Sequence, residues 1–439
     1  MAVTPIRRVL AAGVLAFAAA LALLALVAGG AARRPAVSSL ASLPDAPHPG
    51  ASTGERIRIL QATVRADPKD AGGWTQLAAA ELQRVRETGD AGFYLRAQGS
   101  VERGLQLAPG DPGALTERAA LELARHDFRT GLADASLAHR LAPQVDRPYG
   151  ALVDALVELG RYRAAGRVLQ EMVDRRPDLA AYARVSYFRE LHGDLEGAVG
   201  AMRLAVSAGG EVPENAAYVR TLLGGLELQL GRIAAARLDY REALAQVPGY
   251  VPALAGLAKA DVARGRLGAA IARLRSVVAR LPLPEYVIAL GEAEQAAGRA
   301  AAARRDLALV HVEEGLLARA GVNTDVELAI FEADHGSPRR AVALARRAWA
   351  AAPSVRSADA LGWALTRSGA PRAGLRWADR ALALGSRDAT FLAHAGLADR
   401  AAGRPARARR LLRAALASNP RFSALLAPEA ARALRGLGG

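Results

Sequence analysis

Histidine is the first side chain to consider for chemistry, because the chain has seven histidines and no cysteine. Without cysteine there is no thiolate nucleophile, no disulfide and no cysteine-bound zinc. Glu332 and His335 have the Glu-x-x-His spacing that puts two ligands on one helical face in di-iron carboxylate proteins. Such a site needs a second motif and further carboxylates facing it, and the sequence shows neither. We therefore predict no metal and no cofactor.

Acid–base catalysis has equally little support. Glu294, Asp154 and Glu190 are carboxylates among apolar neighbours, but no nucleophile is paired with them. A phosphate loop, a G-x-S-x-G turn and a dinucleotide fingerprint are all missing from the sequence. His192 and His335 each precede a glycine, in LHGD and DHGS, which is typical of a residue near the last carbonyls of a helix. We predict that the protein is not an enzyme.

The positive charge is concentrated near the carboxyl end. Between Ser337 and Phe422 there are 17 arginines and 4 aspartates, which accounts for most of the net charge of +15. The helix face that carries these arginines has two interpretations. It is either an ordinary solvated face or an electrostatic patch that binds lipid headgroups or an acidic partner. Trp349 and Trp377 are almost the only aromatics among these arginines, and we expect them to be packing residues, which argues against nucleic acid.

A long apolar segment opens the chain. Residues 9–32 contain no charged side chain and are flanked by pairs of arginines. At about 1.5 Å per residue this segment is long enough to cross a bilayer. We predict a membrane anchor within residues 1–34, with a cleaved signal peptide, and hence a secreted protein, as the alternative.

The short basic tail ahead of this segment favours a cytoplasmic amino terminus, so the rest of the chain would lie outside the cytoplasm. The arginine count on the two sides is nearly balanced and adds little to this orientation. Residues 35–55 are rich in Pro, Ser, Ala and Gly and are expected to be a flexible tether.

A repeat pattern fills the remainder. Residues 231–248, GRIAAARLDYREALAQVP, are matched in the placement of small and large apolar residues by residues 265–282, GRLGAAIARLRSVVARLP. The turn glycines that mark the pattern are 33, 34 or 38 residues apart: Gly160, Gly193, Gly231, Gly265, Gly298, Gly336, Gly369 and Gly403. Each lies between two helix-length segments, where a residue with positive φ suits a tight turn.

This pattern resembles the tetratricopeptide repeat, a 34-residue helix-turn-helix unit. Leu223-Gly224, Leu290-Gly291 and Leu361-Gly362 supply its Leu-Gly pair. Its small helix B position is filled in seven repeats, by Ala165, Ala198, Ala236, Ala270, Ala303, Ala341 and Ala408. The resemblance implies an all-α fold, a right-handed superhelical solenoid of nine or ten repeats over residues 56–420, and a capping helix within residues 421–439.

Two stretches depart from the pattern. Trp74 and Ala97 are too far apart, which predicts a longer loop around residues 87–90. The stretch from Val310 to Asn323 is also extended and predicts a lengthened helix B.

In this family helix A lines a concave groove that binds a protein segment. The second, fifth, ninth and twelfth positions of helix A face the ligand, which implies a partner-binding groove made of Asp154, Tyr187, Glu190, Tyr218, Thr221, Lys259, Glu292, Gln295, Arg356, Asp359, Trp363 and Arg400. The three aromatics are expected to be exposed anchors, or alternatively to pack between helices. We predict a membrane-tethered scaffold that binds a protein or peptide. An assembly or recruitment factor for an exported or membrane enzyme complex is the alternative, and an enzyme with an unrecognised site comes third.

Overall fold

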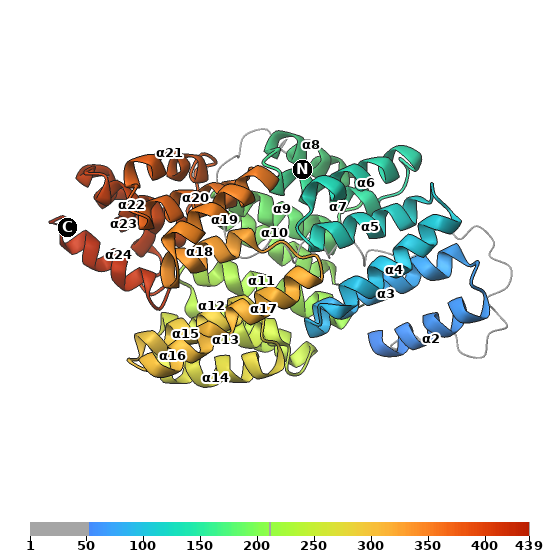
Figure 1. Cartoon of the computed structure of the whole chain (residues 1–439), viewed down its shortest axis with the longest axis horizontal. Helices are drawn as coiled ribbons and strands as arrows, with labels where there is room; N and C mark the ends of the chain where they lie inside the picture. The colour runs from blue at the N-terminus through green and yellow to red at the C-terminus, as the bar shows by residue number, and fades with distance from the viewer. Residues whose placement is uncertain (1–51, 210–211, 439) are drawn as a thin grey trace, which may run out of the picture. The chain divides into compact units, whose positions relative to one another are not determined.

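The computed structural model describes residues 52–209 and 212–438, and every regular element in those ranges is an α-helix (Figure 1). The predicted anchor, and all but the end of the predicted tether, lie outside the described residues. The prediction of an all-α fold is confirmed for the part that the structure describes.

The helices follow one another with short connections and are numbered as in Figure 1. They are α2 (Thr53–Ala66), α3 (Ala71–Thr88), α4 (Gly92–Leu107), α5 (Pro112–Ala124), α6 (Phe128–Leu141), α7 (Arg147–Glu158), α8 (Tyr162–Arg175), α9 (Leu179–Leu191), α10 (Leu195–Ala208), α11 (Pro213–Gln229), α12 (Ile233–Gln246), α13 (Val251–Ala263), α14 (Leu267–Arg280), α15 (Pro284–Ala296), α16 (Ala300–Ala308), α17 (Val310–Arg319), α18 (Asp325–His335), α19 (Pro338–Ala351), α20 (Val355–Arg367), α21 (Pro371–Ala381), α22 (Ala389–Ala401), α23 (Pro405–Ala417) and α24 (Leu426–Arg435).

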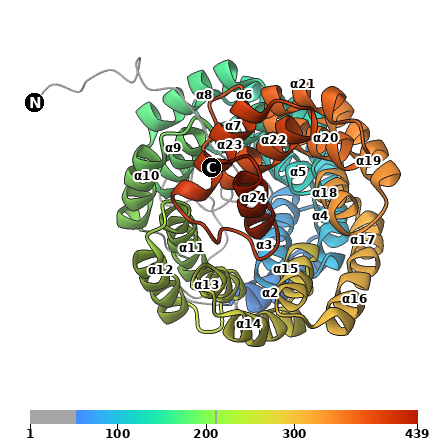
Figure 2. The ribbon, with the colours of Figure 1, turned by 90° about the vertical axis from the view of Figure 1, so that its left-hand side faces the viewer.

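The chain divides into two compact units. The N-terminal unit contains residues 52–181 together with 316–323, and the C-terminal unit contains the described residues of 182–315 and 324–438. In both units, helices that are neighbours in sequence pack against each other in pairs. In the C-terminal unit, α11, α13, α15, α18 and α20 form an inner row, and α12, α14, α16, α19 and α21 form an outer row (Figure 2). The inner helices are the A helices of the predicted repeats.

Close contact between helices depends on small residues that face large ones. A Cβ atom added to Gly224 on α11 would lie 2.7 Å from Cε1 of Tyr240, and one added to Gly256 on α13 would lie closer still to the same atom. Tyr240 on α12 is 2% exposed, so its ring fills the space between two successive inner helices. Leu307 has the same relation to Gly291, with a distance of 2.5 Å.

The turns between paired helices use left-handed glycine at seven of the eight predicted positions, with φ between 69° and 85°. Gly336 is the exception, because its φ is −128°. Here glycine is needed because the Glu332 side chain lies against its backbone. An added Cβ would overlap Oε2 of Glu332, and this oxygen accepts a hydrogen bond from the Ser337 N–H. His126 occupies the equivalent turn between α5 and α6 with φ 64°, a conformation that costs energy for a residue with a side chain.

A row of buried carboxylates ties the repeats of the C-terminal unit together. In five repeats the acid lies four residues before the turn glycine, at Glu227, Asp261, Glu294, Glu332 and Asp399, and each is at most 2% exposed. Every one of them pairs with arginine on a neighbouring helix or turn, as Asp261 does with Arg237 at 2.9 Å and with Arg273 at 3.3 Å. Because an unpaired buried charge is costly, each pair fixes the spacing of the helices it joins.

The two departures from the repeat pattern have different causes from those we predicted. The prediction of a longer loop around residues 87–90 is wrong. The extra residues lengthen α3, which ends at Thr88, and the turn to α4 contains only Gly89 to Ala91. The prediction of a lengthened helix B is also wrong. Helix α16 ends at Ala308, and a separate helix, α17, starts at Val310.

The segment after α17 is held by the N-terminal unit. Ala320 and Val322 are buried in the core that also contains Leu82, Val101 and Leu115. The Asn323 N–H donates to the Arg125 carbonyl at 2.9 Å. These contacts make residues 316–323 part of the N-terminal unit.

The close contact at Tyr240 provides a matched test, because Gly224 and Gly225 are adjacent in α11. An added Cβ at Gly225 meets no atom within 4 Å, whereas one at Gly224 overlaps the Tyr240 ring. We expect Gly224→Ala to lower the free energy of unfolding by about 1–3 kcal/mol and Gly225→Ala to raise it by up to about 1 kcal/mol. Urea unfolding followed by circular dichroism measures both changes, and equal effects would contradict the packing described above.

Candidate functional site

The structure divides the twelve predicted groove residues by their exposure. Six are buried, at most 9% exposed: Asp154, Tyr187, Glu190, Tyr218, Asp359 and Trp363. Six keep accessible surface, of which Lys259, Gln295 and Arg400 are exposed and Thr221, Glu292 and Arg356 are half-buried. Asp154 belongs to the N-terminal unit and the other eleven to the C-terminal unit.

The predicted exposure of the three aromatics is not found. Tyr187 is 5% exposed, Tyr218 9% and Trp363 2%. The Trp363 ring stacks on His394 at 4.1 Å between ring centroids, and its Nε1–H donates to Asp334 at 2.9 Å. Helix A of these repeats is buried on nearly all sides, so the aromatics contribute to packing here, which was the alternative interpretation of them.

Accessible charge remains on four successive inner helices of the C-terminal unit. Lys259 lies on α13, Glu285 on α15, Glu327 on α18 and Arg356 on α20. Glu327 and Arg356 form an ion pair at 3.1 Å. We call these four residues the inner charged row. Its signs run positive, negative, negative, positive along the helices.

The members of the inner charged row act on one another electrostatically. Protein atoms crowd Glu285 although it keeps exposed surface, and this desolvation raises the pKa of its carboxyl. Lys259 and Arg356 lower the pKa of Glu285, and Glu327 raises it. Desolvation also lowers the pKa of Lys259, with Glu285 opposing the shift. A charged group arriving here would meet partly dehydrated charges, which attract more strongly than fully hydrated ones.

One further contact and one exposed side chain extend this polar surface. Glu292 on α15 lies 3.2 Å from Nε2 of His335, the last residue of α18. Gln295, one turn further along α15, is exposed. The sequence identified Glu292 and Gln295 but missed Glu285 and Glu327, and it considered His335 as a helix-end residue and as a metal ligand but not as a groove residue. The position rule for helix A could have found Glu285, which is the second residue of α15.

A buried titratable cluster lies behind the inner surface. Nδ1 of His394 is 2.9 Å from Asp359 Oδ2. Burial lowers the pKa of His394, but the charge of Asp359 and its hydrogen bond outweigh burial and raise it. Burial also raises the pKa of Asp388 to about 7 and that of Glu190 to about 8, and the nearby carboxylate of Asp388 adds to the shift at Glu190. The Gln229 Nε2–H donates to Glu190 Oε1 at 2.7 Å.

These buried groups do not form a catalytic arrangement among the described residues. Glu190 is enclosed, so no substrate reaches it, and burial alone accounts for most of its shift. The Glu332 carboxylate next to His335 is occupied by Arg340 and by the Ser337 N–H. Within residues 52–209 and 212–438, no three His, Asp or Glu side chains converge as metal ligands would.

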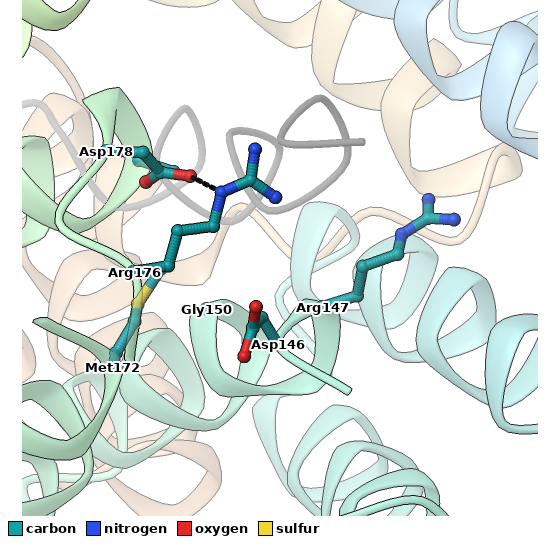
Figure 3. A pocket seen from close by; sticks show the side chains of 7 residues that line it. Asp146, Arg147, Gly150, Met172, Arg176 and Asp178 are labelled. Carbon is teal, nitrogen blue, oxygen red and sulfur yellow. Dashed lines mark ion pairs between the residues drawn. The ribbon is translucent and has the colours of Figure 1, made fainter. Parts of the chain in front are cut away.

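A shallow depression opens in the N-terminal unit between α7 and α8 (Figure 3). Its empty volume is about 310 Å³, part of which is open solvent, and Asp146, Arg147, Met172, Arg176 and Asp178 line it. The Nε of Arg176 lies 3.1 Å from Asp178 Oδ2, and Arg147 pairs with Glu117. These charges are already neutralised by one another, so the depression does not define a ligand site.

No helix in the described part of the chain is both long enough and apolar enough to span a membrane. The predicted anchor falls before that part begins and stays a prediction.

A comparison with protein-family models agrees with the repeat pattern over part of the chain. Residues 227–291, which include α12, α13 and α14, match the family model of the tetratricopeptide repeat. This stretch therefore carries the tetratricopeptide repeat, a fold that generally serves as a scaffold for protein–protein interaction. No curated protein sequence matches the chain.

Several solved structures resemble parts or most of the fold. The APC/C hetero-tetramer Cut9–Hcn1 shares 18% identity with a TM-score of 0.37, over 88% of this chain and 67% of that one. A thermophilic tetratricopeptide-repeat protein of Thermus thermophilus shares 20% identity with a TM-score of 0.36, over 48% and 98% of the two chains. PilW, a type IV pilus biogenesis factor, shares 18% identity with a TM-score of 0.39, over 46% and 94%.

The raised pKa of Glu190 makes stability depend on pH. A carboxyl whose pKa is raised to about 8 in the folded state stabilises the fold at low pH. This contribution is lost as the pH rises from about 4.5 to about 8, because the unfolded chain releases the proton first. Glu190→Gln keeps the acceptor for Gln229 and removes the titration, so we expect a smaller fall in unfolding free energy between about pH 5 and about pH 8. Urea titrations at both pH values measure this fall. The same fall in both proteins would show that Glu190 is ionised in the fold.

Proposed function

We propose that the protein is a scaffold that binds a segment of another protein along the inner helices of its C-terminal unit. The observation that supports this best is the inner charged row, which places accessible charge on α13, α15, α18 and α20 in turn. Repeat proteins bind through several neighbouring units, and a row of this kind offers one contact per unit. An enzyme has no comparable support from the described residues.

The charges indicate what kind of segment fits. Packed helices are about 8–10 Å apart, so an extended chain places a side chain at each inner helix every three residues or so. An acidic side chain would face Lys259 and a basic side chain would face Glu285, whereas Glu327 and Arg356 already pair with each other at 3.1 Å. The proposed ligand is therefore an extended segment of mixed charge, with Gln295 and Glu292 available for hydrogen bonds beside it.

The membrane tether belongs to the same proposal. The 24 uncharged residues 9–32 support an anchor, and the Pro-, Ser-, Ala- and Gly-rich stretch from residue 35 supports a flexible connection. This connection ends before residue 55, its predicted end, because α2 begins at Thr53. A tether of about 20 flexible residues has a typical span of about 25 Å, which would hold the repeats close to a bilayer. A scaffold held there is suited to assembling or recruiting an exported or membrane enzyme complex, the alternative form of this function.

Charge reversal within the inner row tests the binding surface. We expect Lys259→Glu to weaken capture of the partner from detergent-solubilised membranes of the source organism by tenfold or more, about 1.4 kcal/mol. Arg241→Glu makes the same charge change at an exposed position of the outer helix α12 and serves as the control. Quantitative mass spectrometry of the captured proteins measures the difference. If both variants capture the same proteins as the original chain, the inner row is not the binding surface.

Fusion reporters test the orientation. A reporter that is active only outside the cytoplasm, fused after Gly439, should be active, because the short basic amino terminus favours staying in the cytoplasm. The matched reporter that requires the cytoplasm should be inactive at the same position. The reverse result would place the repeats, and their partner, inside the cell.

A further inference from the structure

The outer helices of the last repeats carry exposed arginines that lie outside the ion pairs of the fold, although burial raises the pKa of Asp399 and the charge of Arg410 opposes that rise. Arg339 and Arg346 lie on α19, Arg372 on α21, and Arg410 and Arg413 on α23, and all five are exposed. None of the five forms an ion pair or a side-chain hydrogen bond with another described residue. We call these five residues the arginine face.

Other arginines on α19 and α23 form ion pairs within the fold. Arg340 pairs with Glu332 at 3.2 Å, Arg347 with Asp325 at 2.6 Å, and Arg407 with Asp399 at 3.3 Å. Those arginines neutralise buried or half-buried carboxylates and join neighbouring helices. The arginine face has no such task, so its charge remains available to a molecule outside the chain.

Side-chain contacts join the three helices that carry the arginine face. The indole rings of Trp349 on α19 and Trp377 on α21 meet edge to face at 4.8 Å, and the guanidinium of Arg380 lies over both. Arg407 on α23 pairs with Asp379 on α21. These contacts fix α19 to α21 and α21 to α23, so the arginines keep a constant arrangement.

Apolar side chains next to α19 indicate what this surface meets. Leu309 is 42% exposed and Val312, on α17, is 58% exposed. The neighbouring Glu314 pairs with Arg340 at 3.2 Å, which places this part of α17 beside the start of α19. Exposed leucine and valine beside unpaired arginine suit the boundary between headgroups and acyl chains, where apolar groups insert and cations meet phosphate. An acidic protein is the other possible occupant, and the experiment below separates it from a bilayer.

We propose that the arginine face, together with Leu309 and Val312, binds the surface of an anionic lipid bilayer. This contact is separate from the proposed anchor, because it uses helices of the C-terminal unit and depends on lipid charge. Bound in this way, α19, α21 and α23 lie against the bilayer, while Glu327 and Arg356 of the inner charged row lie on α18 and α20, the inner partners of α19 and α21.

The test uses the full chain and the absence of native cysteine. Ala343, exposed on α19 between Arg339 and Arg346, is replaced by cysteine and labelled with an environment-sensitive dye. The labelled chain is mixed with vesicles of phosphatidylcholine alone or with added phosphatidylglycerol. We expect a blue shift and increased emission only with phosphatidylglycerol, reversed by high salt. A dye at Ala234→Cys, exposed on the outer helix α12, should not respond.

Matched substitutions separate the arginine face from charge in general. Arg346→Gln, Arg372→Gln and Arg410→Gln together should abolish the response at position 343. Arg161→Gln, Arg163→Gln and Arg167→Gln remove the same charge from exposed positions at and after the start of α8 and should leave the response intact. Loss in both triple variants would mean that only net charge matters and would overturn the proposal.

Two further results would also overturn it. One is a response to polyglutamate with none to phosphatidylglycerol vesicles, which would assign the arginine face to an acidic protein. The other is an equal response to both lipids. Flotation with phosphatidylcholine vesicles reports the anchor independently, so failure of the anchor and failure of the arginine face are distinguishable.

Discussion

The repeats depend on the close approach of helices at small residues. Tyr240 reaches the backbone of two successive inner helices because Gly224 and Gly256 have no side chain to prevent it. Ala236 and Ala270 are fully buried at the small position of their own outer helices. Since a helix pair cannot bury its apolar face alone, this contact is repeated along the chain, and each repeat is stabilised by the next.

The buried carboxylates refine this packing. Glu227, Asp261 and Glu294 are almost completely enclosed, and each is held by arginine. Apolar contact alone would allow one pair of helices to slide or rotate over another. A buried ion pair with fixed geometry disfavours such movement, because breaking it leaves a charge without a partner. The arginines that hold these carboxylates lie mainly on outer helices, as Arg237 does on α12 and Arg275 on α14.

Much of the fold could be predicted from the sequence, because its signals are local. A small residue, a turn glycine and a large apolar residue at fixed spacing define a helix pair without information from elsewhere in the chain. Gly336 and the segment after α16 could not be predicted in this way. Their conformations depend on the Glu332 carboxylate and on the core around Leu82 and Val101. The functional surface was predicted less well, since Trp363 has a favourable position in helix A but is covered by His394 and Arg367.

The central claim is that the inner helices bind a protein segment and the outer helices do not. Site-specific photo-crosslinking in intact cells tests this claim most directly. A crosslinking amino acid at Gln295, exposed on α15, should give a covalent adduct with a specific protein. The same amino acid at Ala301, exposed on the outer helix α16, should give no such adduct. An adduct from Ala301 and none from Gln295 would contradict the claim and assign protein binding to the outer helices.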